Sequence, residues 1–553
     1  MTDWEKVMVA KEREFQTMFN RMDDDRDEAI CTKYVMVDAE GKAAKGVSNV
    51  TLPEPKAFLE KCSARLAMAE CQTVVDSDKL DDSKTSKIEQ FLDDVNFESD
   101  MILSRKGQKD TRSQLAELVC LRGPIAKQLL LRMDGENLIC DKRVLDTRYL
   151  LYEASENGVL WAAPMMIRSA WDIANEYDYE IQGDTAEVKD CWDDNENVIF
   201  IDNKPILTRP NPYGFCPFIV QIPACGLSIQ EKDYFKYRGE SIFSLLRNDR
   251  GESIFDECNF IASILKTMSC DLTKPALMLR NEDGTITLLE EYPGDPGSVT
   301  SLGKAKLELI PKRDMTNAAR YYKEIIELNK QLSTYTILDF GSTTLPLSGA
   351  AITKLAETKG ELLMYRLNAI AQLMQQDARM TIKQFPKGKT VKIGEEGHKR
   401  TYKAGDLDGE YTIKYRFWSN TKEDMSADAA IAGALKGFYS EDTIRRDYMK
   451  SKNPDLEAQK LDAEQLENDN EIIRMQRQLK ALIIQADKDP QKNLEAWILL
   501  DKIVNLIKRT KLDLSVPLAN EPNKKSNNSQ TNALAAMLAS NQGMKPSQEA
   551  ISG

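Results

Sequence analysis

Histidine, the side chain that most often serves as a general base near neutral pH, occurs once in these 553 residues, as His398. It lies in the run Gly-Glu-Glu-Gly-His-Lys-Arg, which is typical of an exposed loop. A single imidazole rules out most acid–base schemes that depend on histidine. We therefore expect His398 to be exposed and the chain to lack a histidine-based catalytic centre.

Phosphate-binding and nucleophile motifs are also missing. The only candidate for a P-loop is Gly388-Lys389-Thr390, but the position that must carry the first glycine is occupied by Lys383. No G-x-S-x-G nucleophile elbow occurs. These absences argue against an ATPase and against a serine hydrolase.

Acidic clusters are the remaining candidates for a metal site. Asp23-Asp24-Asp25 forms one cluster, and Asp190, Asp193 and Asp194 form another. Either cluster could bind a divalent ion, but each also fits a solvated turn, since two-metal nucleases take their carboxylates from different core strands. We expect no catalytic residue, no metal and no cofactor, so the sequence does not predict an enzyme.

The cysteines do not form a zinc site either. No Cys-x-x-Cys pair occurs among the ten, and thiolates must cluster to bind zinc. Most lie in apolar contexts that suit reduced core residues. They are Cys31, Cys62, Cys71, Cys120, Cys140, Cys191, Cys216, Cys225, Cys258 and Cys270.

Bulk composition predicts a soluble protein of two or three domains. Hydrophobic residues make up 42% and charged residues 29% of the chain. The net charge of −13 argues against a broad basic face that coats nucleic acid. It leaves open solubility alone or a channel whose acidic wall repels DNA. No apolar run is long enough to span a membrane and the N-terminus is charged, so we expect no membrane and a cytoplasmic chain.

Periodicity predicts helices first and a sheet afterwards in the first 225 residues. The expected helices are 1–30, 54–72, 84–103, 110–130 and 167–177. The expected strands are 136–140, 148–153, 159–164, 186–192, 198–201 and 215–222. Strands are expected again at 390–393 and 411–418, and they need the earlier sheet as a partner for their apolar side.

Between these regions a distinctive order of elements runs from 250 to 379. A helix at 250–269 precedes a turn-rich insert, 270–313, that contains strand-like runs and several prolines and glycines. A second helix follows at 314–335, then a loop, then a long helix from 350. The C-terminal part reads as helices at 426–437, 440–451, 455–487 and 491–510, with Ser440 as an N-cap and a polar tail beyond 519.

Two motifs precede the first of these helices. Asn211-Pro212-Tyr213-Gly214 closes the expected sheet, and the hexapeptide Arg-Gly-Glu-Ser-Ile-Phe occurs twice, at 238–243 and 250–255. Glycine followed by an N-cap serine suits the start of a helix. With the helix–insert–helix–loop–long helix order over residues 100–470, these motifs resemble portal proteins of tailed double-stranded DNA bacteriophages.

The resemblance implies an α+β, predominantly helical fold with an α/β wing, a two-helix stem, a small α/β clip, a long wing helix and a helical C-terminal crown. In this chain the parts would be the wing, 1–249; the stem helices, 250–269 and 314–335; the clip, 270–313; the tunnel loop, 336–349; the long helix and returning strands, 350–425; the crown, 426–518; and a disordered tail, 519–553.

It also implies a function. Such proteins form a ring, typically of twelve copies, at one capsid vertex of the virion after assembly in the host cytoplasm. Double-stranded DNA passes through the ring during genome packaging and ejection. The implied partners are terminase, the major capsid and scaffolding proteins, and head-completion or tail adaptor proteins.

The resemblance further points to two sets of site residues. The tunnel loop would face DNA through Ser342, Thr343, Thr344, Leu345, Pro346, Leu347, Ser348 and Gly349, with Lys354 and Lys359 near phosphates or simply solvated. The clip docking surface would include Asn281, Glu282, Asp283, Glu290, Glu291 and Tyr292.

Two other classes remain open from the residues. A scaffolding or adaptor protein of the virion without a channel would have no use for a Pro/Gly-rich β insert between two helices. A nuclease or protease of a virion module would need a catalytic constellation that the sequence does not contain.

Overall fold

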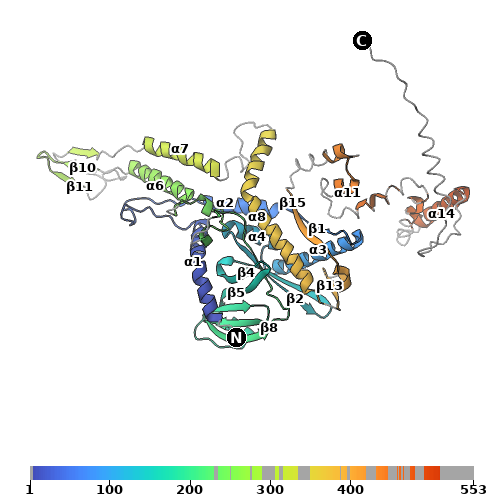
Figure 1. Ribbon diagram of the computed structural model, residues 1–553. Coiled ribbons are helices and arrows are strands. Elements are labelled where there is room, and N and C mark those ends of the chain that lie inside the picture. The colour runs from blue at the N-terminus through green and yellow to red at the C-terminus, as the bar shows by residue number, and fades with distance from the viewer. Residues whose placement is uncertain are drawn as a thin grey trace, which may run out of the picture. The chain divides into compact units, whose positions relative to one another are not determined.

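The computed structural model describes residues 4–228, 234–248, 251–273, 277–288, 306–309, 316–333, 349–386, 388–394, 399–418, 431–436, 438–445 and 491–510, with scattered positions between 457 and 482. The chain divides into two compact units, Met1–Pro454 and Asp455–Gly553. Helices and strands are mixed in the first unit, so the expected α+β class is confirmed (Figure 1).

The helices of the first unit whose bounds the structure describes include α1 (Trp4–Ala29), α2 (Glu54–Met68), α3 (Asp82–Arg105), α4 (Thr111–Leu121), α5 (Ala170–Tyr177), α6 (Ile254–Thr273), α7 (Thr316–Ser333), α8 (Gly349–Gln384), α9 (Ala404–Leu407) and α11 (Glu441–Thr443). Its strands are β1 (Glu70–Asp76), β2 (Ile125–Asp134), β3 (Asn137–Leu145), β4 (Leu150–Ser155), β5 (Gly158–Ser169), β6 (Thr185–Trp192), β7 (Glu196–Ile201), β8 (Lys204–Pro210), β9 (Phe218–Gln221), β10 (Leu277–Arg280), β11 (Ile286–Leu288), β12 (Lys306–Leu309), β13 (Thr390–Ile393), β14 (Arg400–Lys403) and β15 (Thr412–Trp418). The second unit contains α14 (Gln491–Thr510).

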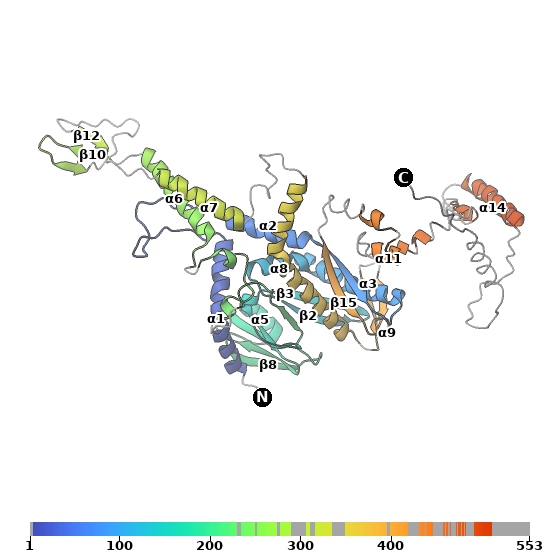
Figure 2. The same cartoon turned by 45° about the horizontal axis from the view of Figure 1, so that its top comes forward.

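One five-stranded sheet has the order β14-β13-β3-β2-β9. β13 follows α8 and pairs in parallel with β3, with Lys392 opposite Asn137. The expectation that the strand at 390–393 rejoins the earlier sheet is thus confirmed. The same expectation was wrong for the strand at 411–418, because β15 pairs with β1 in a separate two-stranded sheet. Helices α3 and α8 pack on this sheet (Figure 2), and the buried strand residues beneath them include Leu129, Leu138 and Val391.

A second five-stranded sheet, β4-β5-β6-β7-β8, is an antiparallel meander. The apolar run of β7 alternates between its two faces: Val198 and Phe200 belong to the core formed with α1, whereas Ile199 and Ile201 pack with α5. Burial on both faces explains why this strand is continuously apolar. The meander thereby anchors α1, whose Phe15 and Met18 are each 2% exposed.

Helix α8 is tied to the first sheet by polar as well as apolar contacts. Gln384 at its C-terminal end accepts from the Leu131 amide at 3.0 Å and donates to the Leu129 carbonyl at 2.9 Å. Ile370 and Leu373 of the same helix are 2% and 0% exposed. These contacts hold the second half of α8 firmly against β2.

Three sequence-based expectations about elements were wrong. The helix expected over 110–130 ends at Leu121, and strand β2 begins at Ile125, because Gly123 has a φ of +86° and Pro124 follows it. The helix expected over 54–72 ends at Met68, and Glu70–Asp76 forms β1 with β15 as its partner. The helix expected from 167 starts at Ala170, since 167–169 still belong to β5.

Other elements were either missed or lie outside the described part of the chain. Strands β8 and β14 were not predicted from the sequence. The N-cap expected at Ser440 is present, since its hydroxyl accepts from the Thr443 amide at 3.2 Å. Helix α14 occupies the range expected for the last helix. Most of 426–487 and all of the tail from 519 fall outside the description.

No helix among the residues that the structure describes is both long and apolar enough to cross a membrane.

Candidate functional site

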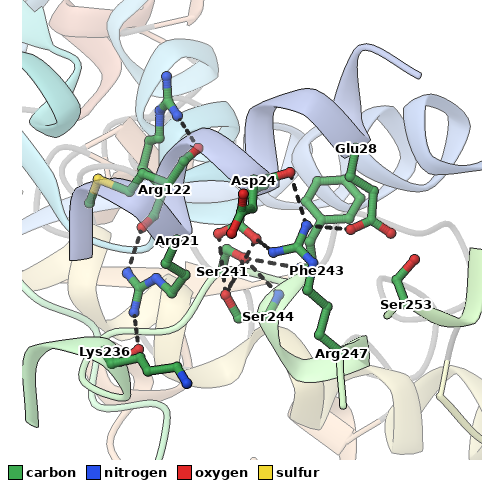
Figure 3. Close-up of polar contacts among 12 residues, drawn as sticks. Arg21, Asp24, Glu28, Arg122, Lys236, Ser241, Phe243, Ser244, Arg247 and Ser253 are labelled. Atoms are coloured by element: carbon green, nitrogen blue, oxygen red, sulfur yellow. Dashed lines mark hydrogen bonds and ion pairs between the residues drawn. The ribbon is translucent and has the colours of Figure 1, made fainter. Parts of the chain in front are cut away.

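The residues that lead into α6 are packed into the body of the first unit through an unusually dense set of polar contacts. We call this segment, 234–253 without 249 and 250, the junction. It contains the whole first copy of the repeated hexapeptide and residues 251–253 of the second copy, whose Ile254 and Phe255 begin α6. Arg250 lies outside the description. Figure 3 shows the junction with the α1 residues that bind it.

Glycines allow the backbone around the first copy of the hexapeptide to lie directly against neighbouring backbone. A Cβ atom at Gly123 would lie 1.8 Å from the carbonyl oxygen of Gly239, and one at Gly226 would lie 1.8 Å from that of Tyr237. Gly239 itself has a φ of +63°, and a Cβ there would lie 2.6 Å from Ile222. Any side chain at these positions would push the junction away from the sheet.

Arg21 of α1 binds the same segment from the other side. Its guanidinium donates to the carbonyls of Lys236 at 2.9 Å, Arg238 at 3.2 Å and Gly239 at 3.2 Å, and to that of Arg122 at 3.3 Å. Burial lowers the pKa of Arg21, while the nearby Asp25 carboxylate opposes this effect. A guanidinium with several donors in a fixed fork is suited to hold several carbonyls at once.

The serines of the two hexapeptides play the same local role. Ser241 is fully buried and accepts from the Phe243 and Ser244 amides at 3.1 and 2.9 Å, at the start of a short 3-10 turn. Ser253 accepts from the Asp256 amide at 3.1 Å, and the Asp256 carboxylate accepts from the Ser253 amide at 3.0 Å. This reciprocal pair is a capping box at the start of α6.

The phenylalanines of the two copies meet on α2. Phe243 and Phe255 lie 6.2 and 5.9 Å from Phe58 by ring centroids, and 6.4 Å from each other. All three are at most 5% exposed. The repeat therefore places two serines that accept from nearby backbone amides, and two aromatic anchors, around one apolar site, which explains its presence in structural terms.

Arg247, between the two copies, pairs with two carboxylates of α1. It forms ion pairs with Asp25, which is 0% exposed, and with Glu28, and it donates to the Asp24 carbonyl at 3.0 Å (Figure 3). Burial raises the pKa of Asp25 and of Glu28, and Arg247 opposes both shifts. The charged groups are thus compensated within the fold.

Beyond the junction, α6 and α7 form an antiparallel pair that lies side by side in both views (Figures 1 and 2). Phe260 and Tyr322 meet edge to face at 6.4 Å, and the Tyr322 hydroxyl donates to Glu257. That hydrogen bond raises the pKa of Tyr322 to about 12. Between the two helices in sequence lies a three-stranded antiparallel sheet, β11-β10-β12.

An extended segment, 48–52, runs along α6. Its amides at Ser48, Val50 and Leu52 donate to side chains of α6 at 2.8–3.0 Å. The acceptors are Thr267, Ser263 and Asn259, in that order. Alternate amides of an extended chain are spaced to match polar residues four apart on one helix face.

The outer side of α7 is apolar and uncovered. Tyr321, Ile325 and Leu328 are 70%, 46% and 59% exposed and share one stripe, whereas Ile326, which lies off that stripe, is 7% exposed. Only part of the apolar surface of this helix is therefore buried in the single chain.

Few of the site residues expected from the sequence can be placed. Gly349 is the first residue of α8, and Lys354 and Lys359 lie in the same helix, with nothing described of their side chains. Ser342 to Ser348 lie outside the description, as do Glu290, Glu291 and Tyr292. Asn281, Glu282 and Asp283 form the turn between β10 and β11, where Asp283 accepts from the Thr285 amide at 3.1 Å.

The acidic clusters considered as metal sites are used otherwise. Asp23 accepts from Arg148 at 3.0 Å, and Asp190 accepts from Asn197 at 2.6 Å. Across the residues that the structure covers, no group of three or more His, Cys, Asp or Glu is arranged to hold a metal ion. His398 lies outside those residues. The sequence did not indicate that Arg21 and Asp25 bind the junction, since Lys236 and Arg247, their partners there, lie more than 200 residues away along the chain.

No protein-family model matches this chain, and no curated protein matches it. Solved structures that resemble it include the neck of a native GTA particle computed with C12 symmetry and the neck of an empty GTA particle computed with C6 symmetry. The identities are 11% and 12%, each match covers 71% of this chain and 89% of the other, and both TM-scores are 0.36. A TM-score this low does not establish a shared fold, so neither fold nor function is transferred from them.

Proposed function

We propose that this chain is the portal protein of a tailed double-stranded DNA bacteriophage, a ring subunit at one capsid vertex. The observation that supports this most is the order of elements around the junction. Helix α6, the small β10–β12 sheet, helix α7 and the long helix α8 follow one another, and β13 then returns to the sheet that precedes them. This order matches the stem, clip, stem and wing helix of the portal resemblance.

Ring formation is supported by the uncovered stripe on α7. Three large apolar side chains on one helix face are costly to leave in water, and a second copy of the chain would cover them. A closed ring needs different faces on the two sides of each subunit. We propose that the α7 stripe of one subunit packs against the α6 side of the next, with twelve copies in the ring.

In this proposal the ring is the channel for genome packaging and ejection. The tunnel loop, 336–349, would face DNA, and the clip would bind terminase first and head-completion or tail adaptor proteins later. Major capsid and scaffolding proteins would surround the wing. The acidic net charge suits a channel that must not hold DNA tightly.

We also propose that the chain has no enzymatic activity of its own, since the acids and arginines at the junction bind one another. The alternative function is a virion scaffold or adaptor without a channel. The helix–β unit–helix order favours the portal, because an adaptor has no need of a β unit between two paired helices.

The experiment is a mass measurement of assembled complexes by mass photometry. We expect the unaltered chain to form closed oligomers, and the double variant Ile325→Asp/Leu328→Asp to give monomers, since it places charges in the subunit contact. The matched control, Arg320→Asp/Lys323→Asp, changes residues on the polar side of α7 that are 80% and 57% exposed and should leave the oligomers intact. Equal oligomers in both variants would contradict the proposed contact.

A further inference from the structure

The junction makes contact with two helices that are distant from α6 in sequence, α1 and α8. We infer that segment 236–247 is a relay through which α1 and α8 set the position of the α6 N-terminus. The inference concerns contacts within one chain, so it holds whether or not the chain forms a ring.

The link to α8 is Arg366. This residue is 1% exposed, and its guanidinium donates to the carbonyl oxygen of Glu240 at 2.9 Å. A hydrophobic side chain of similar volume would often pack there at lower cost in free energy than a buried charge. The arginine is therefore better explained by the position it gives to the Glu240 carbonyl than by the stability of the core.

The segment has little freedom around that carbonyl. The thiol of Cys225 donates to the same oxygen at 3.2 Å, and the amide of Ile242 donates to the Cys120 carbonyl of α4 at 2.9 Å. A Cβ at Gly123 would lie 1.8 Å from the Gly239 carbonyl oxygen, and a Cβ at Gly239 would lie 2.6 Å from Ile222, so neither glycine could carry a side chain. A displacement of α8 at Arg366 is thus passed to the segment instead of being absorbed by a gap.

The link to α1 lies at both ends of the segment. Arg21 binds the carbonyls at its start, and Asp25 and Glu28 bind Arg247 at its end. Ser244 also donates to Asp25, at 3.2 Å. Helix α1 therefore fixes the line along which the segment runs (Figure 3).

The last step leads from Arg247 to α6. Arg247 and Ser253 form an antiparallel bridge, and the Asn248 amide donates to the Glu252 carbonyl at 3.0 Å. Ser253 is the N-cap of α6 through its reciprocal bonds with Asp256. A change in the position of Arg247 therefore moves the cap and the first turn of α6.

Hydrogen exchange of the full-length protein, followed by mass spectrometry, tests the relay. The variant Arg366→Met should speed exchange of amides 257–262 of α6 about tenfold, a change expected when a buried charged hydrogen bond is lost and a cap loosens. The control Arg379→Met removes an exposed arginine of the same helix and should change nothing there.

Two further variants separate the relay from core stability. Arg247→Met should speed exchange in α6 without changing α8, whereas Arg238→Met, an exposed arginine of the same segment, should have no effect. If Arg366→Met does not fold, Arg366→Lys retains one donor and should give a smaller rise in α6. Faster exchange confined to 239–242, or spread equally over β2 and β3, would overturn the relay.

Discussion

At the scale of residues, the clearest physical feature is a buried group of three charges that joins α8 to the first sheet. The carboxylate of Asp377 accepts from Lys142 at 2.7 Å and from Lys127 at 3.1 Å, and all three side chains are at most 4% exposed. Burial lowers the pKa of Lys127 to about 8. The two lysines hold the pKa of Asp377 below its ordinary value although burial alone would raise it.

We expect Asp377→Asn to lower the free energy of unfolding by about 3–5 kcal/mol, because it leaves two buried ammonium groups without a counter-charge. The matched control is Asp141→Asn, whose partner Arg132 is 60% exposed, and it should cost about 0.5 kcal/mol or less. Urea unfolding followed by fluorescence measures both. Similar losses of unfolding free energy in the two variants would show that the buried group stabilises the fold no more than an exposed ion pair does.

Buried thiols give the chain a defined response to alkaline pH. Burial raises the pKa of Cys71, Cys140 and Cys216 from 9.0 to about 12 each. A raised pKa in the folded state stabilises the fold below pH 9, and this contribution is lost as pH rises from 9 to 12. The lowered pKa of Lys127 has the opposite effect, since it raises the stability of the fold as the pH rises from 8 to 10.5. This is the contribution of one lysine, whereas several buried thiols lower the stability.

Stability should therefore fall between pH 9 and 10. In Cys140→Ala the fall should be smaller by about 1 kcal/mol, since one thiol no longer ionises on unfolding. The control is Cys270→Ala, which removes an exposed thiol. Its free energy of unfolding should fall between pH 9 and 10 by as much as that of the unaltered chain. Urea unfolding at the two pH values decides; an equal fall in all three proteins would refute the assignment to buried thiols.

At the scale of elements, α6 is held by backbone contacts as well as by its own apolar side. We expect Asn259→Ala to expose the Leu52 amide, whose donor bond to Asn259 is 2.8 Å long, and to speed its exchange about tenfold. Lys266→Ala, an exposed position of the same helix, serves as the control. Unchanged exchange at Leu52 in Asn259→Ala would mean that the segment 48–52 does not depend on this contact.

The elements that the sequence predicted correctly are those with strong local signals. The helix at 84–103 and most strands of the meander have clear periods, and Ser440 has the expected cap geometry. The helix over 110–130 failed because the apolar run from Ile125 to Leu131 fits a buried strand as well as a helix. Strand β1 was missed because its partner, β15, is far away in sequence.

The junction could be predicted only in part. Its glycines and the N-cap serine of α6 are local signals that the repeated hexapeptide contains. The hydrogen bonds that hold it in place join Arg21 to Gly239 and Arg366 to Glu240, and these pairs are 218 and 126 residues apart. No spacing rule links such positions, so their roles emerge only from the fold.

At the scale of the whole molecule, the proposed ring would cover the apolar α7 stripe, whose Tyr321, Ile325 and Leu328 are exposed in the single chain. Apolar surface gathered on one helix face favours association with further copies. This is the physical link between the fold and the proposed portal.

Electron microscopy of the purified full-length protein tests that central proposal most directly. We expect closed rings with a central channel, and class averages should resolve a stem made of α6 and α7 from each subunit. A chain that stays monomeric at high protein concentration, or that forms assemblies without a central hole, would contradict the portal and favour the adaptor.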